Sequence, residues 1–502
     1  MTYLTEGMEP AHVLRFFEDI CRIPHGSGNE AEMAQFIMTL AAEQGLAYEQ
    51  DQHGNVLVHL YASPGCEEAP MFLMQGHMDM VLAKEDWVTL DLNTDPVPLR
   101  RDGNLLYAEG TTLGADNAVG LCNMLAVMTD KTVKHPPMEL LFTVREERGL
   151  EGIALFDASL LKSRRMLTMD CGDPDVLMLG SAGSLAYDLC MNLEQEDSHG
   201  KGFCVELSGL HGGHTGLEIG NGYANALSLM TTILAALEAE CGAKLVSLEV
   251  GGGSGSIPRS AKSIVLLPSS CRVSGDVESP AHTADSVLVR AVSIVDQYAA
   301  IFRSEFELTE DSLEFGCGQV LLPETMLTAE STRALLDFLT FYPCGDQKRH
   351  AKVQTQVMGS ALIKNASLKE GVFTGQYAIR SNTDAYKYIL GSRFERLCRH
   401  FGVEHRIVKD MPAWPEKPQS HLKDLCLEVY RDCFGIDLKT ELVHGGEEAS
   451  IIAREIPDME IVGIAPYSRG AHTTSERLHL DTMLPVWNFL TALLARLAEE
   501  RV

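Results

Sequence analysis

Short apolar runs alternate with amphipathic stretches over the first 180 residues of the chain and again near its end. Apolar runs of strand length lie at residues 55–60, 71–76, 139–144, 165–169 and 459–465. Helical spacing of apolar positions follows at 117–128 and 484–500, and Ser27 with Glu30 forms a capping-box pattern ahead of an earlier helix. Strands that alternate with helices are typical of a mainly parallel sheet covered on both faces. The pattern predicts an α/β domain.

The pattern changes near residue 183. From there to about residue 395, strand-like runs mix with two long helical patterns, at 225–240 and 286–302, and with a glycine-rich join at 251–256. A chain of 502 residues also exceeds what one hydrophobic core usually supports. We therefore predict an inserted α+β domain at 184–395, which interrupts an α/β domain made of residues 1–183 and 396–502.

The composition narrows the classes of partner. A formal charge of −29 repels phosphate backbones and anionic lipid surfaces, so we expect neither a nucleic-acid nor a membrane partner. We see no apolar run of 18 residues and no secretion signal, and we expect no membrane span. Thirteen cysteines without a C-x-x-C pair fit reduced thiols, and thus a cytoplasmic protein.

Acids and histidines follow the predicted strands. In "LMQGHMDMV", residues 73–81, His77 and Asp79 stand two apart, so in extended backbone both side chains lie on one face. Five more such residues follow strands or open the helix at 117–128, namely Asp116, Glu146, Glu147, Asp170 and His472. Ligands of open parallel sheets bind beyond the carboxyl ends of the strands. These seven side chains could therefore converge in one cleft.

Each of these residues alone has a structural explanation. Asp116 fits a helix cap, Glu146 and Glu147 fit a solvated charge pair, and His77 with Asp79 fits a surface turn. Seven acids and histidines at successive strand ends are harder to explain as unrelated structural residues. Two histidines with three or four carboxylates suit zinc, cobalt or manganese, and a shared carboxylate would hold two ions about 3.5–4 Å apart. The implied chemistry is hydrolysis by a metal-activated water.

Five motifs together carry a family resemblance. H-x-D after a strand, "GTTLGADNAVG", "TVREERGLEG", "MDCGD" and "GAHTTSERL" resemble the co-catalytic di-zinc exopeptidases, a family that includes aminoacylase and bacterial dipeptidases. The resemblance spans nearly the whole chain. It implies a dipeptidase that acts on small peptides with two divalent cations, zinc first and cobalt or manganese as alternatives. A related aminoacylase, deacylase or tripeptidase is the second hypothesis, and an inactive relative that serves as a binding module is the third.

The same resemblance implies roles for the residues at the strand ends. His77 and Asp170 would bind one metal, Glu147 and His472 the other, and Asp116 would bridge the two. Asp79 would orient and polarise His77. Glu146 would act as the general base on the attacking water. In the family, the peptide bond after the bridging aspartate, here Asp116–Asn117, is typically cis.

The inserted domain resembles the family's lid. His214, in "GGHTGLEI", would stabilise the oxyanion, within its own chain or across a possible homodimer. Asn225 and Arg380 would hold the substrate's carboxylate, and His444 is a further substrate-binding candidate. The sequence departs from the family pattern at Arg145, in "HGGEEAS" around His444 and in "IRSNTDA" around Arg380, which leaves the substrate preference open.

Overall fold

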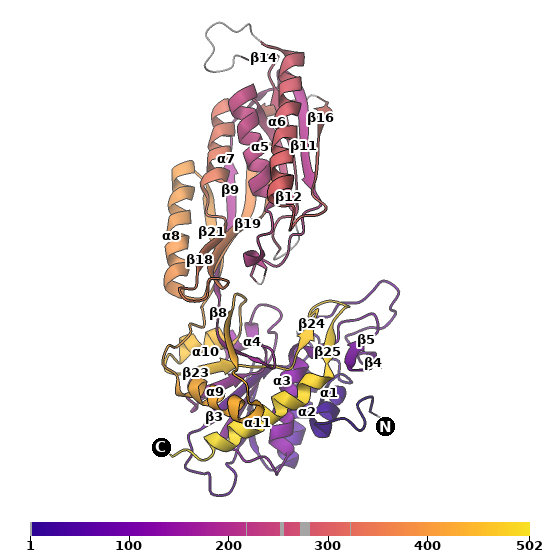
Figure 1. Cartoon of the computed structure of the whole chain (residues 1–502), viewed down its shortest axis with the longest axis vertical. Coiled ribbons are helices and arrows are strands. Elements are labelled where there is room, and N and C mark those ends of the chain that lie inside the picture. The colour runs from indigo at the N-terminus through magenta and orange to yellow at the C-terminus, as the bar shows by residue number, and fades with distance from the viewer. Residues whose placement is uncertain (1–2, 217, 252–255, 272–281, 322, 502) are drawn as a thin grey trace. The chain divides into compact units, whose positions relative to one another are not determined.

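The computed structural model describes residues 3–216, 218–251, 256–271, 282–321 and 323–501. The chain divides into two compact units (Figure 1). Unit 1 comprises Met1–Ser181 and Ala413–Val502, and unit 2 comprises Ala182–Pro412. The two units are described separately below.

Unit 1 is built on an eight-stranded sheet. In spatial order its strands are β1 (Ala47–Gln50), β2 (Val56–Leu60), β6 (Met138–Thr143), β3 (Phe72–His77), β7 (Arg165–Thr168), β23 (Glu460–Gly463), β8 (Val176–Ser181) and β22 (Lys439–Val443). The pairs β6–β3, β3–β7, β7–β23 and β8–β22 are parallel, and the other three neighbouring pairs are antiparallel. The prediction of a mainly parallel α/β sheet is confirmed.

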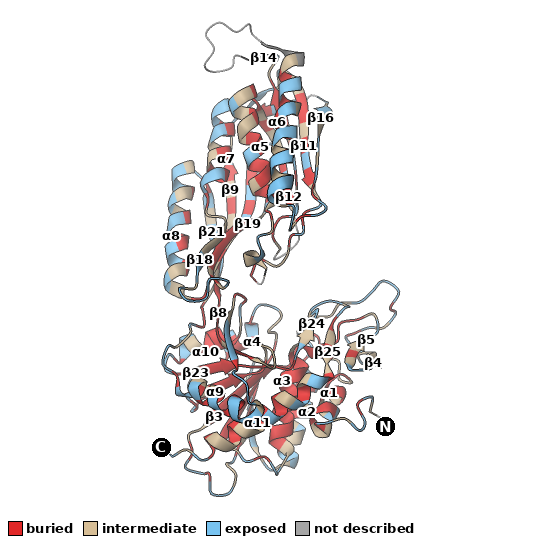
Figure 2. Cartoon of the chain, viewed as in Figure 1, coloured by how far each residue is buried: buried red, intermediate tan, exposed pale blue. Residues whose placement is uncertain are grey.

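Helices cover this sheet. They are α1 (Ala11–Ile20), α2 (Ala31–Glu43), α3 (Ala115–Thr129), α4 (Glu151–Leu155), α9 (His421–Phe434), α10 (Ala449–Glu455) and α11 (Met483–Leu497). All six residues of β3 and all six of β6 are buried, which requires that both faces of the sheet are covered (Figure 2). The amphipathic faces predicted at 117–128 and 484–500 became α3 and α11, both packed in the core.

A small second sheet in unit 1 carries His472. Its strands, in spatial order, are β24 (Ser468–Arg469), β25 (Arg477–His479), β5 (Leu105–Ala108) and β4 (Leu99–Asp102). Strands β24 and β25 pair as a hairpin, and His472 lies in its loop at 470–476. The expectation that His472 directly follows the strand at 459–465 is therefore wrong. Strand β23 already ends at Gly463, because the chain then leaves the main sheet to build the hairpin.

Unit 2 is an α+β structure with an antiparallel sheet. Its strands, in spatial order, are β16 (Glu314–Val320), β11 (Lys201–Ser208), β13 (Ser260–Leu267), β12 (Lys244–Gly251), β19 (Val357–Lys369), β20 (Val372–Ser381), β9 (Gly183–Asn192) and β21 (Glu404–Met411), with β18 (Gly345–Arg349) beside β19. The long helices of this unit are α5 (Ala226–Cys241), α6 (Ala284–Glu305), α7 (Ala329–Phe341) and α8 (Asp384–Phe401). The expected join at 251–256 lies mostly outside the described residues.

The observed boundaries of unit 2 differ from the expected insertion at 184–395. The unit ends at Pro412, and residue 396 lies inside α8. The reason is long-range pairing, because β21 aligns antiparallel with β9. The buried Lys387 of α8 strengthens this arrangement, since its ammonium donates to Asp410 Oδ1 (2.7 Å) and to the carbonyl oxygen of Met411 (2.6 Å). That the unit acts as a lid or a dimerisation domain stays a prediction.

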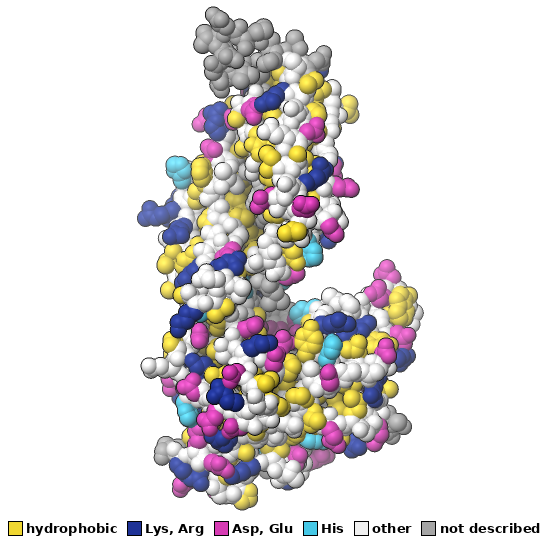
Figure 3. Space-filling model, in the orientation of Figure 1, with side chains coloured by type: hydrophobic (Ala, Val, Ile, Leu, Met, Phe, Trp, Pro, Cys, Tyr) yellow, Lys and Arg dark blue, Asp and Glu magenta, His cyan; other side chains and the backbone are white. Residues whose placement is uncertain are grey.

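Three features bear on the expectations from composition. None of the helices that the structure describes is long and apolar enough to cross a membrane. The twelve cysteines whose side chains the structure describes are all free thiols. Lysine and arginine side chains are scattered among acidic and apolar ones on the face shown in Figure 3.

Candidate metal centre

The loops that follow the strands of unit 1 bring the predicted ligands together. His77 is the last residue of β3, and Glu147 and Asp170 follow β6 and β7. Asp116 opens α3. Ligand atoms of His77, Asp116 and Glu147 all lie within 4.8 Å of one another. Side chains from separate strand ends thus meet at one point.

Asp116 stands between two pairs of ligands. Its Oδ1 lies 3.0 Å from His77 Nε2, which is also 3.2 Å from Asp170 Oδ1. Its Oδ2 lies 3.3 Å from His472 Nε2, which is also 2.8 Å from Glu147 Oε1. Each oxygen of Asp116 therefore faces one histidine, and each histidine also lies beside a further carboxylate.

The donor set fits two divalent cations. Two ligand atoms about 2.0–2.1 Å from one zinc ion at a tetrahedral angle are about 3.3 Å apart, close to the separations around Asp116. Glu147 Oε1 is buried and accepts no hydrogen bond among the described residues, although His472 Nε2 is 2.8 Å away. A carboxylate oxygen that faces a ring nitrogen without hydrogen-bond geometry suits a shared cation better than a direct bond.

The protonation equilibria reflect this crowding of acids. Burial lowers the pKa of His77, but the carboxylates of Asp170, Asp116 and Asp79 outweigh burial and hold it well above its usual value. The carboxylates of Asp116 and Glu147 raise the pKa of His472 to about 10. Burial raises the pKa of Asp170 to about 6. A site that concentrates this much negative charge favours cations.

Glu146 differs from its neighbour Glu147. Within the described part of the chain its carboxylate makes no hydrogen bond and no ion pair, whereas the carboxylate of Glu147 faces His472. Burial, together with Asp170, Glu147 and Glu448, raises the pKa of Glu146 well above its usual value, against the opposing effect of His77. A carboxyl group with a raised pKa and no committed partner is suited to accept and release a proton.

Asp79 holds the Glu146–Glu147 turn. Its Oδ1 accepts the amide N–H of Glu146 at 2.9 Å, and its Oδ2 accepts the amide N–H of Glu147 at 3.2 Å. The Ser27 hydroxyl also donates to Oδ2, at 2.7 Å. Burial opposes ionisation of Asp79, but His77, the Ser27 hydroxyl and the Glu146 amide lower its pKa to about 2. The prediction that Ser27 caps α2 is wrong, because its hydroxyl is bonded to Asp79.

Two backbone features accompany the site. The Asp116–Asn117 peptide bond is cis, as the family resemblance implies. His472 and Arg145 have positive φ angles, 65° and 52°, which are uncommon for residues with a side chain. Such conformations are concentrated at functional sites.

Sequence reasoning missed two buried acids near the cluster. Glu476 accepts backbone hydrogen bonds from the loop before Asp116. Glu448 accepts hydrogen bonds from Thr143 Oγ1, at 2.6 Å, and from Gln75, and burial raises its pKa to about 8. Glu448 lies in "HGGEEAS" and Glu476 in "GAHTTSERL", two motifs in which only the histidine was predicted to have a role. The missed signal was a glutamate four residues beyond each of His472 and His444.

The remaining candidates lie elsewhere in the two units. In unit 2, His214 Nδ1 accepts the Gly216 amide N–H at 3.3 Å, and Asn225 Oδ1 caps α5 by accepting the amide N–H of Leu227 at 2.9 Å. Arg380 is partly buried, and burial lowers its pKa. It makes no ion pair with any described residue. His444, in unit 1, is buried just beyond β22.

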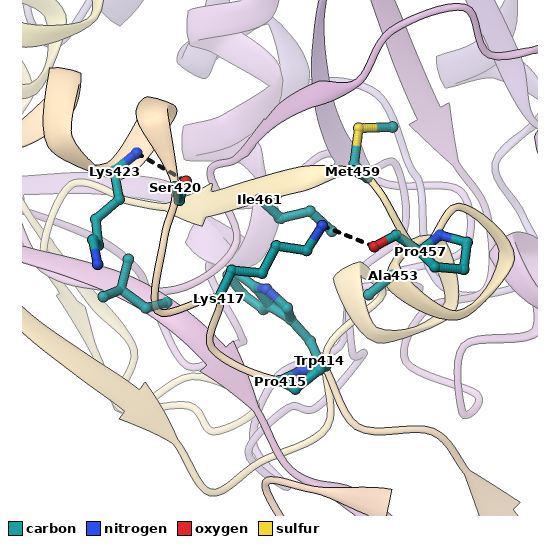
Figure 4. Close-up of a pocket in the computed structure, with 10 residues that line it drawn as sticks. Trp414, Pro415, Lys417, Ser420, Lys423, Ala453, Pro457, Met459 and Ile461 are labelled. Carbon is teal, nitrogen blue, oxygen red and sulfur yellow. Dashed lines mark hydrogen bonds between the residues drawn. The ribbon is translucent and has the colours of Figure 1, made fainter.

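A separate pocket of about 150 Å³ lies in unit 1 (Figure 4). Its walls include Leu179, Trp414, Met459 and Ile461, and Lys417 at its side donates to the Pro457 carbonyl oxygen at 2.8 Å. None of the predicted site residues lines it. The pocket is therefore distinct from the ligand cluster around Asp116.

Comparison with known proteins places the chain in a family. Residues 73–496 match the model of peptidase family M20/M25/M40. The cytosol non-specific dipeptidase of Escherichia coli K12 is 29% identical over 489 residues, which cover 97% of this chain and 98% of that protein. The crystal structure of aminoacylhistidine dipeptidase from Vibrio alginolyticus superposes with a TM-score of 0.87 at 27% identity and covers 98% of each chain.

A more distant structure shares the fold. A tripeptidase from Staphylococcus aureus matches with a TM-score of 0.54 at 14% identity, over 98% of this chain and 99% of that one. The chain belongs to peptidase family M20/M25/M40. As a member of this family it is a hydrolase that acts on peptide bonds.

Proposed function

We propose that this chain is a two-metal dipeptidase that hydrolyses small peptides, with aminoacyl-histidine (Xaa-His) dipeptides among a broad range of substrates. The observation that carries this proposal is the position of Asp116, whose two oxygens each face one histidine, and each of these histidines also lies beside a further carboxylate. This is the arrangement that a carboxylate bridging two cations requires.

We assign the two cations to the residues of the ligand cluster. His77 and Asp170 would bind one, His472 and Glu147 the other, and Asp116 both. When bound, two divalent cations, zinc first with cobalt or manganese as alternatives, would polarise the peptide carbonyl and acidify the attacking water. The donor chemistry does not select among these three metals.

Glu146 would then carry the proton. As the water oxygen attacks the peptide carbonyl carbon, the Glu146 carboxylate takes one proton from that water. The same group gives the proton to the leaving nitrogen as the C–N bond breaks, so the products are an amine and a carboxylic acid, which then loses its own proton to give the carboxylate. The absence of any partner for the Glu146 side chain among the described residues supports this role, because a committed carboxylate would have to break a bond first.

Residues of unit 2 would complete substrate binding. An accepting Nδ1 places the proton of a neutral His214 ring on Nε2, which makes Nε2 a donor suited to an oxyanion. Arg380, without a carboxylate partner among the described residues, is suited to the carboxylate end of a dipeptide. The roles of Asn225 and His444 in substrate binding stay predictions. The amide oxygen of Asn225 already caps α5.

Several observations favour a dipeptidase over an aminoacylase, deacylase or tripeptidase. The two relatives described above with more than 25% identity over nearly the whole chain are both named dipeptidases, and the tripeptidase, at 14% identity, shares only the fold. The Escherichia coli relative is named a cytosol dipeptidase, and the cysteines whose side chains the structure describes are all free. We therefore propose that this protein acts in the cytoplasm. A homodimer is part of the proposal.

Metal content and a substrate panel test the proposal together. We expect about two divalent ions per chain, loss of activity with a chelator, and recovery with zinc, cobalt or manganese. The panel should contain Xaa-His and other dipeptides, a tripeptide and N-acetyl amino acids. Faster hydrolysis of N-acetyl amino acids than of every dipeptide would favour the deacylase, and an active protein without stoichiometric metal would refute the two-metal mechanism.

A further inference from the structure

Glu476 is a buried carboxylate that accepts hydrogen bonds from four consecutive backbone amides. Oε2 accepts the N–H groups of Leu113 (2.8 Å) and Gly114 (3.0 Å), and Oε1 accepts those of Ala115 (2.8 Å) and Asp116 (3.4 Å). Only 1% of Glu476 is exposed. Both oxygens are thus used on the loop that carries the candidate bridging ligand.

The loop is shaped for this contact. Gly114 has a φ of +75°, in the left-handed region that favours glycine, and a Cβ there would lie 2.7 Å from Met80 Sδ. A left-handed residue beside right-handed ones turns successive N–H groups toward one point, which creates an anion-binding concavity. The loop also opens the 15-residue helix α3, whose N-terminal dipole favours a negative charge.

Glu476 comes from the same hairpin loop as His472. The loop is closed by the Thr473 hydroxyl, which donates to the Gly470 carbonyl oxygen at 2.7 Å, and by the Glu476 amide, which donates to the Thr473 carbonyl oxygen at 3.2 Å. His472 Nε2 lies 3.3 Å from Asp116 Oδ2. The hairpin loop therefore contacts the Asp116 loop in two ways. The His472 ring faces the Asp116 carboxylate, and the Glu476 carboxylate accepts hydrogen bonds from the backbone of that loop.

We infer that Glu476 is a positioning residue that sets the separation of Asp116 and His472 before any cation binds. Without Glu476, the two loops would meet only through the side chains of His472 and Asp116. Since the hairpin pairs with the small sheet and Asp116 opens α3, no backbone pairing among the described residues joins the two loops in place of this contact. The inference rests on the proposed function only in treating Asp116 and His472 as metal ligands.

The substitution Glu476→Gln tests this inference. It keeps the size of the side chain but replaces one acceptor oxygen by an NH₂ group, which faces backbone donors and cannot accept from them. We expect the metal-free protein to fold and to bind the cation of the His472 side about 10- to 100-fold more weakly, the usual scale for losing a partner that orients a ligand. Titration of the metal-free protein with Zn²⁺ by calorimetry measures this without any substrate. Saturating metal should restore kcat.

Glu139 supplies the matched control. It is also fully buried in unit 1, and it accepts the amide N–H of Lys162 (3.0 Å) and both the amide N–H (3.1 Å) and the hydroxyl (2.6 Å) of Ser163. Glu139→Gln should destabilise the fold yet leave Zn²⁺ affinity unchanged. Equal Zn²⁺ affinity in wild type and Glu476→Gln, or equal weakening in both variants, would overturn the inference.

A second variant covers the case in which Glu476→Gln does not fold. Glu476→Asp keeps the charge but is one methylene shorter, so it should fold and still bind Zn²⁺ less tightly than wild type. Unchanged Zn²⁺ affinity in a folded Glu476→Asp would also overturn the inference. Failure of the proposed function looks different: the wild-type protein would bind two Zn²⁺ ions and hydrolyse none of the dipeptides.

Discussion

The Nδ1 atom of His77 lies 2.9 Å from the main-chain carbonyl oxygen of Asp79 and 3.6 Å from its carboxylate Oδ1. The hydrogen bond that orients the histidine ring is therefore made by the backbone of Asp79. Its carboxylate is bonded instead to the amides of Glu146 and Glu147. Asp79 thus acts on two sides of the site, on the ring through its backbone and on the glutamate pair through its side chain.

Asp79→Asn separates these two effects. The substitution leaves the main-chain carbonyl of residue 79 bonded to His77. The NH₂ group of the new side chain would face the amide N–H of Glu146 or Glu147, and two donors cannot form a hydrogen bond with each other. We expect activity to fall about 10- to 100-fold, with His77 still able to bind metal. The measurement is kcat together with metal content. Ser27→Ala, which removes one donor to Asp79, should have a smaller effect, and a larger loss in Ser27→Ala than in Asp79→Asn would contradict this account.

Glu146→Gln and Glu147→Gln should differ in kind. Glu146→Gln should keep both metals and lose about 10²- to 10⁴-fold in kcat, because only the proton carrier is removed. Glu147→Gln should weaken one metal site, since its carboxylate faces His472. Metal analysis alongside turnover distinguishes the two variants. The assignment of roles is wrong if both show the same metal content and the same residual rate.

His214→Ala tests the oxyanion role in unit 2. We expect normal folding, full metal content and a kcat lower by about 10²- to 10³-fold, the scale for losing one oxyanion donor. His211, three residues earlier, is the control: its ring stacks on Tyr223 with centroids 4.2 Å apart, and His211→Ala should leave kcat nearly unchanged. A near-normal kcat in His214→Ala would refute the assignment.

Lys387→Met tests the observed end of unit 2. The substitution removes the buried ammonium that bonds Asp410 and Met411 of β21. We expect the local stability of β21 to fall by about 1–3 kcal/mol. Because Asp410 is partly exposed, solvent screens its pairing with Lys387, so the loss should lie toward the lower end of this range. Amide hydrogen exchange of residues 404–411 measures it. Arg406→Met, which breaks the exposed pair with Asp188, should change exchange little, and an equal effect in both variants would count against the buried contact.

The strand and helix pattern of unit 1 could be predicted from the sequence. The run at 71–76 became β3 and the run at 139–144 became β6, because a strand buried on both faces needs continuous apolar residues. The positions of His77 and Glu147 followed, since residues that directly follow parallel strands share one edge of the sheet. These are local properties, readable within a few residues.

Only the tertiary structure placed the partners that come from far along the chain. Local patterns do not specify which strand pairs with which, so the hairpin that holds His472, and the pairing of β21 with β9, could not be read from periodicity. The role of Glu476 could not be read from periodicity either, because it lies some 360 residues along the chain from the amides whose hydrogen bonds it accepts. Its importance depends on a backbone concavity that forms only when Gly114 and the hairpin loop meet. The sequence by itself thus determined which side chains could form the site, and long-range packing decided what holds them there.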